Sequence, residues 1–192
     1  MGITDGHIYL DTNIYFQGQR PAVNIPLSVT RVGRQTLDKL SREVNKELTS
    51  FLGEYNKLQT ISHFGQELTD DVKNKLTEGE LINKFFNQPY QLTVPHSVQL
   101  IIISMILQGI IKTKEELEAY KTGLISASYN RAHQKMFFDI TNTREMKEFN
   151  ENVMKSKDAL LKMKLDDKPV VVKQVKVTQA APKPATVNGV PT

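Results

Sequence analysis

The ten glycines of the chain are the first place to look for a phosphate-binding site. A phosphate-gripping loop requires the pattern G-x-x-x-x-G-K-[ST], in which a lysine follows the second glycine. None of the ten glycines is followed by lysine, so these 192 residues hold no loop of that kind. The chain also has no cysteine, which excludes disulfides and thiolate metal ligands.

The histidines and the paired acids predict no complete catalytic or metal site. No two histidines have the i, i+4 spacing of a helical zinc site, since they stand far apart: His7, His63, His96 and His133. We interpret His63 and His96 as polar edges of core-facing surfaces. No serine, histidine and aspartate lie close enough in sequence to suggest a catalytic triad. The adjacent acids Asp70 and Asp71 are typical of a helix start.

The elements that position any functional side chain fall into zones, and residues 1–33 resemble strands joined by turns. HIYL (7–10) and NIPLSVTRVG (24–33) are rich in β-branched and aromatic residues, and Gly18 and Pro21 are turn signals between them. Two short strands do not form a stable sheet alone. We therefore interpret this zone as the end of a larger sheet, or as a segment that needs a partner.

Helical patterns follow from residue 35 onward. Apolar residues recur at three- and four-residue steps over 35–64, which predicts one amphipathic helix. Further helices are expected over residues 66–164, with starts at Thr69, Pro95, Thr113 and Thr143. The helices after Thr113 and Thr143 are expected to cover 114–140 and 144–164. The pattern predicts a bundle of roughly five or six helices with short loops.

The apolar run at 100–111 and the last 28 residues mark two extremes of composition. The run is 12 residues long, whereas a membrane span needs about 20, so it predicts a buried core helix. Residues 165–192 hold four of the eight prolines and no aromatic residue, which predicts a disordered tail.

The net charge of +4 also leaves open a stand-alone basic helical interaction module that binds nucleic acid.

An ordered block of residues lies at the start of the chain. It consists of Thr4-Asp5-Gly6-His7-Ile8, Tyr15, Gly18, Arg20-Pro21-Ala22-Val23-Asn24 and Ser28-Val29-Thr30-Arg31-Val32-Gly33. This block closely resembles the alpha subunit family of the F-type, rotary ATP synthase, where the nucleotide-binding domain meets the C-terminal helical domain. The resemblance extends over about residues 3–163. It implies a mainly α fold: the C-terminal helical bundle (34–164), preceded by the last strands of the nucleotide-binding α/β domain (1–33).

The resemblance implies roles for six residues. Arg31 stands at the family's arginine finger, which reaches the catalytic site of a neighbouring beta subunit; the alternative is a structural arginine at a strand end. Tyr15, Arg20 and Pro21 match positions that line the adenine pocket of the alpha subunit's own, non-catalytic nucleotide site; the alternative is a turn with a solvated arginine. Where the family has a glutamine pair before a tyrosine, this chain has Asn87-Gln88-Pro89-Tyr90, so Asn87 or Gln88 takes the glutamine's place.

The resemblance further implies a part of a proton-translocating ATP synthase that makes ATP from ADP and phosphate. The implied partners are beta subunits, the gamma rotor subunit and the missing N-terminal part of alpha, with no nucleic acid and no direct membrane insertion. ATP or ADP with Mg would be held at the full-length subunit's site, and no metal site is predicted in this chain. A full alpha subunit is over twice as long, so we expect either a fragment or a subunit split into two polypeptides. The implied location is peripheral, at the cytoplasmic face of the bacterial plasma membrane or at the mitochondrial inner membrane.

Overall fold

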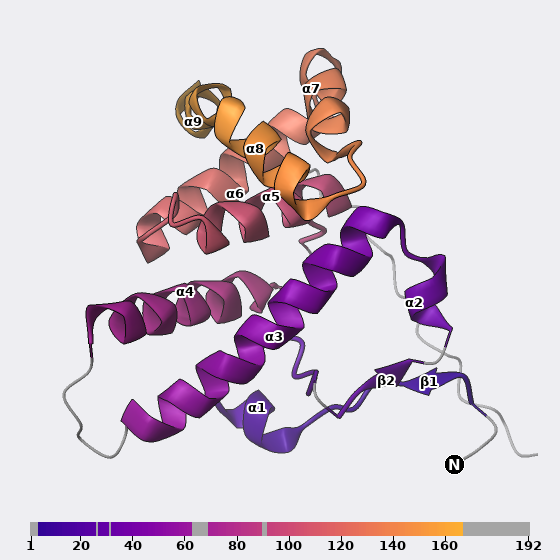
Figure 1. Cartoon of the computed structure of the whole chain (residues 1–192), viewed down its shortest axis with the longest axis vertical. Coiled ribbons are helices and arrows are strands. Elements are labelled where there is room, and N and C mark those ends of the chain that lie inside the picture. The colour runs from indigo at the N-terminus through magenta and orange to yellow at the C-terminus, as the bar shows by residue number, and fades with distance from the viewer. Residues whose placement is uncertain (1–3, 26, 31, 63–68, 90–91, 167–192) are drawn as a thin grey trace, which may run out of the picture.

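The computed structural model describes residues 4–25, 27–30, 32–62, 69–89 and 92–166 (Figure 1). A small N-terminal segment lies beside a helical bundle. The N-terminal segment holds β1 (Gly6–His7), α1 (Thr12–Phe16) and β2 (Val29–Thr30). The bundle is made of α2 (Gly33–Thr36), α3 (Lys39–Ser62), α4 (Asp70–Phe86), α5 (His96–Leu107), α6 (Lys114–Tyr129), α7 (Arg131–Thr141), α8 (Met146–Lys155) and α9 (Lys157–Asp166).

Helix α5 forms the centre of the bundle and contacts α4, α6, α7 and α8. Seven consecutive residues, 100–106, are buried, so the helix is apolar all round rather than on one stripe. This confirms a buried core helix within the predicted run 100–111, but the predicted end is wrong, because the helix stops at Leu107 and Gly109 has a left-handed φ of 65°. None of the helices within the described residues is both long and apolar enough to cross a membrane.

Three of the predicted long helices are interrupted, two of them where a side chain caps the helix that follows. Leu37 is extended, and α3 starts only at Lys39, where the Asp38 carboxylate accepts the Ser41 N–H at 2.6 Å. The predicted helix 114–140 divides at Asn130, whose side chain accepts the Ala132 N–H at 3.0 Å and caps α7. The predicted helix 144–164 divides at Ser156. At Asp38 and Asn130 a short polar side chain bonds to a nearby backbone N–H group, and this outweighs a continuing apolar pattern.

The predicted helix starts have different outcomes. Thr113 is confirmed as a cap, because its hydroxyl accepts the Glu116 N–H at 3.2 Å. Thr69 and Pro95 occupy the N-cap positions of α4 and α5, but neither makes a side-chain capping bond. The prediction for Thr143 is wrong, since the N-cap of α8 is Glu145.

The N-terminal segment contains less strand than its sequence suggests. β1 and β2 pair antiparallel, with Gly6 opposite Thr30 and His7 opposite Val29, and one further bridge joins Leu10 to Val23. Between the strands lies α1, a helix that the turn-rich pattern did not predict; the Asp11 side chain caps it by accepting the Asn13 N–H at 2.8 Å. The fold is thus mainly α with a short two-stranded element, as predicted.

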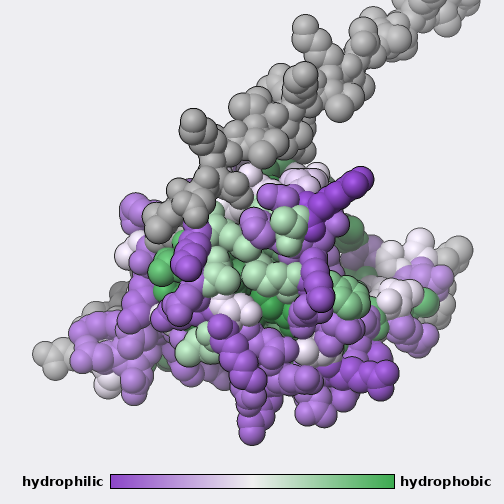
Figure 2. All heavy atoms as spheres, turned by 90° about the horizontal axis from the view of Figure 1, so that it is seen from above, coloured by the Kyte–Doolittle hydropathy of each residue, from purple (hydrophilic) through white to green (hydrophobic). Residues whose placement is uncertain are grey.

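The end of the bundle that carries α7, α8 and α9 is seen from above in Figure 2. Apolar atoms gather in the middle of this face, and hydrophilic side chains surround them. The predicted tail cannot be compared with the structure, because residues 167–192 lie outside the described part of the chain. The predicted domain boundaries therefore stay a prediction.

Candidate functional site

Arg20 forms the centre of a compact turn near the N-terminus. Its guanidinium carbon lies 3.5 Å from the centre of the Tyr15 ring, a cation–π contact. Its Nη1 donates to the carbonyls of Tyr15, at 2.6 Å, and Gln19, at 2.9 Å. Gly18 has φ of 87°, a left-handed conformation that glycine adopts without strain, and so allows the chain to fold back. The guanidinium is therefore held by its own turn.

Three hydrogen bonds between residues that are far apart in the sequence join this turn to the end of α4. The Arg20 N–H donates to Asn87 Oδ1 at 3.0 Å, and Asn87 Nδ2 donates to the Gly18 carbonyl at 3.1 Å. The Gln88 N–H donates to the Arg20 carbonyl at 2.8 Å. We call these bonds the Asn87 clasp. Five of the six residues for which the sequence suggests a role, including Pro21 directly after Arg20, thus come together in one place.

The sixth residue, Arg31, lies outside the described residues, but the backbone on both sides of it is defined. Thr30 pairs with Gly6 across the strands, and its hydroxyl accepts the Gly33 N–H at 2.8 Å. A Cβ atom on Gly33 would stand 2.5 Å from the Thr30 hydroxyl oxygen, and one on Gly6 would stand 2.7 Å from the Val29 carbonyl oxygen. Both glycines therefore allow a close approach around Thr30 that a side chain would prevent.

Two further bonds fix the strand-to-strand connection. Asn24 Nδ2 donates to the Asp11 carboxylate at 3.0 Å, and Asn24 Oδ1 accepts the Leu27 N–H at 3.2 Å. The Asn24 bond and the Asn13 N–H hold the pKa of Asp11 below its ordinary value of 3.8, because both stabilise the carboxylate. The sequence did not suggest a role for Asp11, because α1, the helix that Asp11 caps, was not predicted either.

His96 lies at the first turn of α5, where its ring joins two helices. Its Nε2 stands 2.9 Å from the Ser41 hydroxyl oxygen in α3. Ser41 is 3% exposed, whereas His96 is exposed, so the pair forms a polar edge of the core, as the sequence suggests for His96. Of the other predicted histidine edge, His63, the structure describes nothing.

A cleft of about 440 Å³ lies between the α1 turn, α3 and Asn83 of α4. The sequence analysis did not predict this cleft, because its polar lining comes from three separate segments without a common spacing. Those polar side chains include five carboxamides: Gln17, Gln19, Asn56, Gln59 and Asn83.

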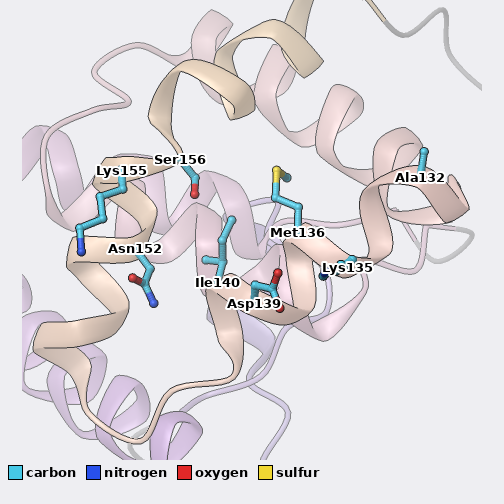
Figure 3. A pocket seen from close by; sticks show the side chains of 8 residues that line it. All are labelled: Ala132, Lys135, Met136, Asp139, Ile140, Asn152, Lys155 and Ser156. Atoms are coloured by element: carbon cyan, nitrogen blue, oxygen red, sulfur yellow. The ribbon is translucent and has the colours of Figure 1, made fainter.

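A second hollow, of about 490 Å³, lies between α7 and α8 (Figure 3). Lys135 and Asp139 of α7 and Asn152 and Lys155 of α8 line it around an apolar part formed by Met136 and Ile140. Of the residues with a predicted role that the structure describes, none lines this hollow.

Comparison with protein families identifies the family of the chain. The family described as "ATP synthase alpha/beta chain, C terminal domain" matches residues 38–160. The chain belongs to this family. In this ATP synthase C-terminal domain, the match covers α3 to α8 together with Asn87 and Gln88. Tyr15, Arg20, Pro21 and Arg31 precede it.

Individual relatives agree with the family. The chain is 39% identical to the ATP synthase subunit alpha of Acetivibrio thermocellus over 105 residues, which is 55% of this chain and 21% of the relative. It is 30% identical to that of Clostridium acetobutylicum over 135 residues, or 69% of this chain and 26% of the relative. For Desulfotalea psychrophila the identity is 39% over 103 residues, or 54% and 20%. The chain thus spans about a fifth to a quarter of the curated relatives that it matches.

Proposed function

We propose that this chain serves as the C-terminal part of an ATP synthase alpha subunit, the regulatory, non-catalytic nucleotide-binding subunit. Its partners would be beta subunits, the gamma rotor subunit and the polypeptide that supplies the rest of alpha. The assembled enzyme would make ATP from ADP and phosphate, peripherally at the cytoplasmic face of the membrane. The family match over residues 38–160 and the similarity to three alpha subunits support this proposal.

The observation that carries the nucleotide part of the proposal is the Asn87 clasp. Residues that are 67 positions apart meet there, so the turn of Arg20 and the end of α4 form one surface. Two backbone carbonyls and the Tyr15 ring already engage the guanidinium. Arg20 would therefore offer its flat face to the base rather than its charge to a phosphate. The phosphates and Mg would be held by a phosphate loop, which these residues do not contain.

Arg31 would act in trans as the arginine finger of a beta-subunit catalytic site. Phosphoryl transfer spreads negative charge over the transferred group, and a guanidinium, which is planar and always charged, stabilises that charge. An arginine finger requires that the backbone carrying it is held in a fixed position. The Gly6–Thr30 pairing and the Thr30–Gly33 hydrogen bond, which lie on either side of residue 31, support this requirement.

The test replaces Arg31 in an enzyme assembled from this chain, the rest of alpha, beta and gamma. Arg31→Ala is expected to lower multisite ATP hydrolysis by at least about a thousandfold, the lower range for arginine fingers. Arg31→Lys should recover little of the turnover that Arg31→Ala loses, because the lysine ammonium does not reproduce the planar, two-pronged guanidinium. Arg131→Ala, at an exposed position in the first turn of α7, is the matched control and should leave turnover unchanged.

Two results would refute the proposal. Normal turnover of the Arg31→Ala enzyme would refute the assignment of Arg31 as an arginine finger. Failure of the chain to co-purify with a beta subunit, together with salt-dependent binding of the chain alone to DNA or RNA, would instead favour the basic interaction module.

A further inference from the structure

Among the described residues that line the cleft between the α1 turn, α3 and α4, none has an ionisable side chain. This is unusual in a chain of which 24% of the residues are charged. The polar part consists of the five carboxamides named above and the Thr49 hydroxyl. The apolar part consists of Ile14, Val23, Ile25 and Leu52. The volume of about 440 Å³ is within the usual range of small-molecule sites.

The composition of this lining narrows the chemistry of a ligand. Without a lysine or arginine, the cleft offers no counter-charge to a phosphate or carboxylate. Without an aspartate or glutamate, it offers none to an amine or a metal ion. Carboxamides present one donor and one acceptor side by side, and they pair with the same arrangement on the edge of a heterocycle, as Asn and Gln do with adenine.

Gly53 provides the space for such a ring. It lies on α3 in the lining of the cleft, and a Cβ atom built on it would meet nothing within 4 Å. Glycine is less favourable than alanine inside a helix, and core packing does not require a glycine here. The open surface at Gly53 leaves room for a flat ring between Asn56, one turn further along α3, and the α1 turn.

We propose that this cleft is a binding site for an uncharged, planar, hydrogen-bonding heterocycle, the chemistry of a free nucleobase or nucleoside. It is a second site, distinct from the nucleotide surface proposed above. Tyr15, Arg20, Pro21 and Asn87 do not line it, whereas Gln17 and Gln19 of the same turn do. The proposal does not depend on the ATP synthase assignment, because it concerns a cleft within this chain alone.

The experiment measures adenosine binding to the 192-residue chain by calorimetry. A Kd on the order of 0.1 mM is expected, which is an ordinary efficiency for a neutral ligand of this size. Gly53→Met fills the cleft and should weaken binding at least tenfold, whereas Gly53→Ala, the matched control, should keep it. Asn56→Leu removes one carboxamide from an exposed helix position and should weaken binding about tenfold. Thermal melting of each variant verifies that it is folded.

Further measurements separate the cleft from the Arg20 turn. Gly53→Met should remove a component of adenosine binding that Tyr15→Ala leaves in place, and inorganic phosphate should not compete with that component. The proposal is overturned if the wild-type chain shows no saturable binding, or if Gly53→Met binds adenosine as tightly as wild type. It is also overturned if Tyr15→Ala abolishes binding, because the base would then lie at the proposed nucleotide surface; that result would leave the ATP synthase proposal standing.

Discussion

Alanine at position 79 is expected to destabilise the bundle, although alanine normally stabilises a helix. Gly79 lies in α4 directly under the Tyr55 ring of α3. A Cβ atom there would stand 2.0 Å from Tyr55 Cδ2 and 2.5 Å from Cε2 and Cγ. Tyr55 is 5% exposed, so its ring has no free space into which to turn. An ordinary contact needs about 3.4 Å, and either the ring or the helix must therefore move by about 1.4 Å.

Three contributions determine how much free energy of unfolding Gly79→Ala loses. Overpacking a core costs about 1–3 kcal/mol, and a clash with the body of a buried ring belongs at the upper end of that range. Moving the ring also strains the hydrogen bond between the Tyr55 hydroxyl and the Asn83 side chain, worth about 1 kcal/mol. The gain in helix propensity offsets about 1 kcal/mol. The net loss in the free energy of unfolding is therefore about 2–3 kcal/mol, or roughly 4–12 °C in melting temperature.

The assay is urea unfolding followed by far-ultraviolet circular dichroism. Gly53→Ala is the matched control, because it makes the same change in the neighbouring helix without any close contact. This control should gain about 0.5–1 kcal/mol. Opposite signs for the two substitutions are the expected result. A gain in stability for both would show that the Tyr55 ring does not rest on Gly79.

Three further changes test the capping and the buried polar contacts. Asp38→Ala should cost about 1 kcal/mol near pH 7; the bond from the Ser41 N–H keeps the pKa of Asp38 below 3.8, so the difference from wild type should disappear as the pH falls below that value in pH-dependent unfolding. Thr113→Ala should cost about 1 kcal/mol at the start of α6 and Thr113→Ser much less, as measured by thermal melting. Asn150→Leu should cost more in urea unfolding than Ser104→Ala, because it leaves the fully buried Ser104 hydroxyl without its acceptor at 2.8 Å, whereas Ser104→Ala removes the buried group itself.

The sequence predicted the fold class and the central helix, but placed several helix ends wrongly. The core helix at 100–106 is identifiable because its composition alone requires burial. Apolar periodicity, by contrast, continues across Asn130 and Ser156, where the chain breaks the helix. At Asn130 the helix breaks because the Asn130 side chain accepts a backbone hydrogen bond. Such a bond does not change the spacing of apolar residues, so it cannot be detected from the periodicity.

The candidate site was predictable only where a known family supplied the pattern. Tyr15, Arg20 and Pro21 stand close together in the sequence, but nothing in spacing or charge indicates that Asn87 would meet them. The uncharged cleft was not predictable at all, because no single segment contains enough of its lining to stand out. Contacts between distant segments depend on how α3 and α4 pack, and packing is a tertiary property.

One edge of α4 connects these features physically. Gly79, Asn83 and Asn87 follow one another at four-residue steps, so they lie on the same side of the helix and its cap. Gly79 admits the Tyr55 ring, Asn83 bonds that ring's hydroxyl and lines the cleft, and Asn87 makes the clasp with Arg20. Any displacement of α4 against α3 therefore shifts the packing, the cleft and the Arg20 turn together. A Gly79→Ala chain should accordingly lose adenosine affinity as well as stability, whereas Thr113→Ala, at the start of α6, should lose stability alone.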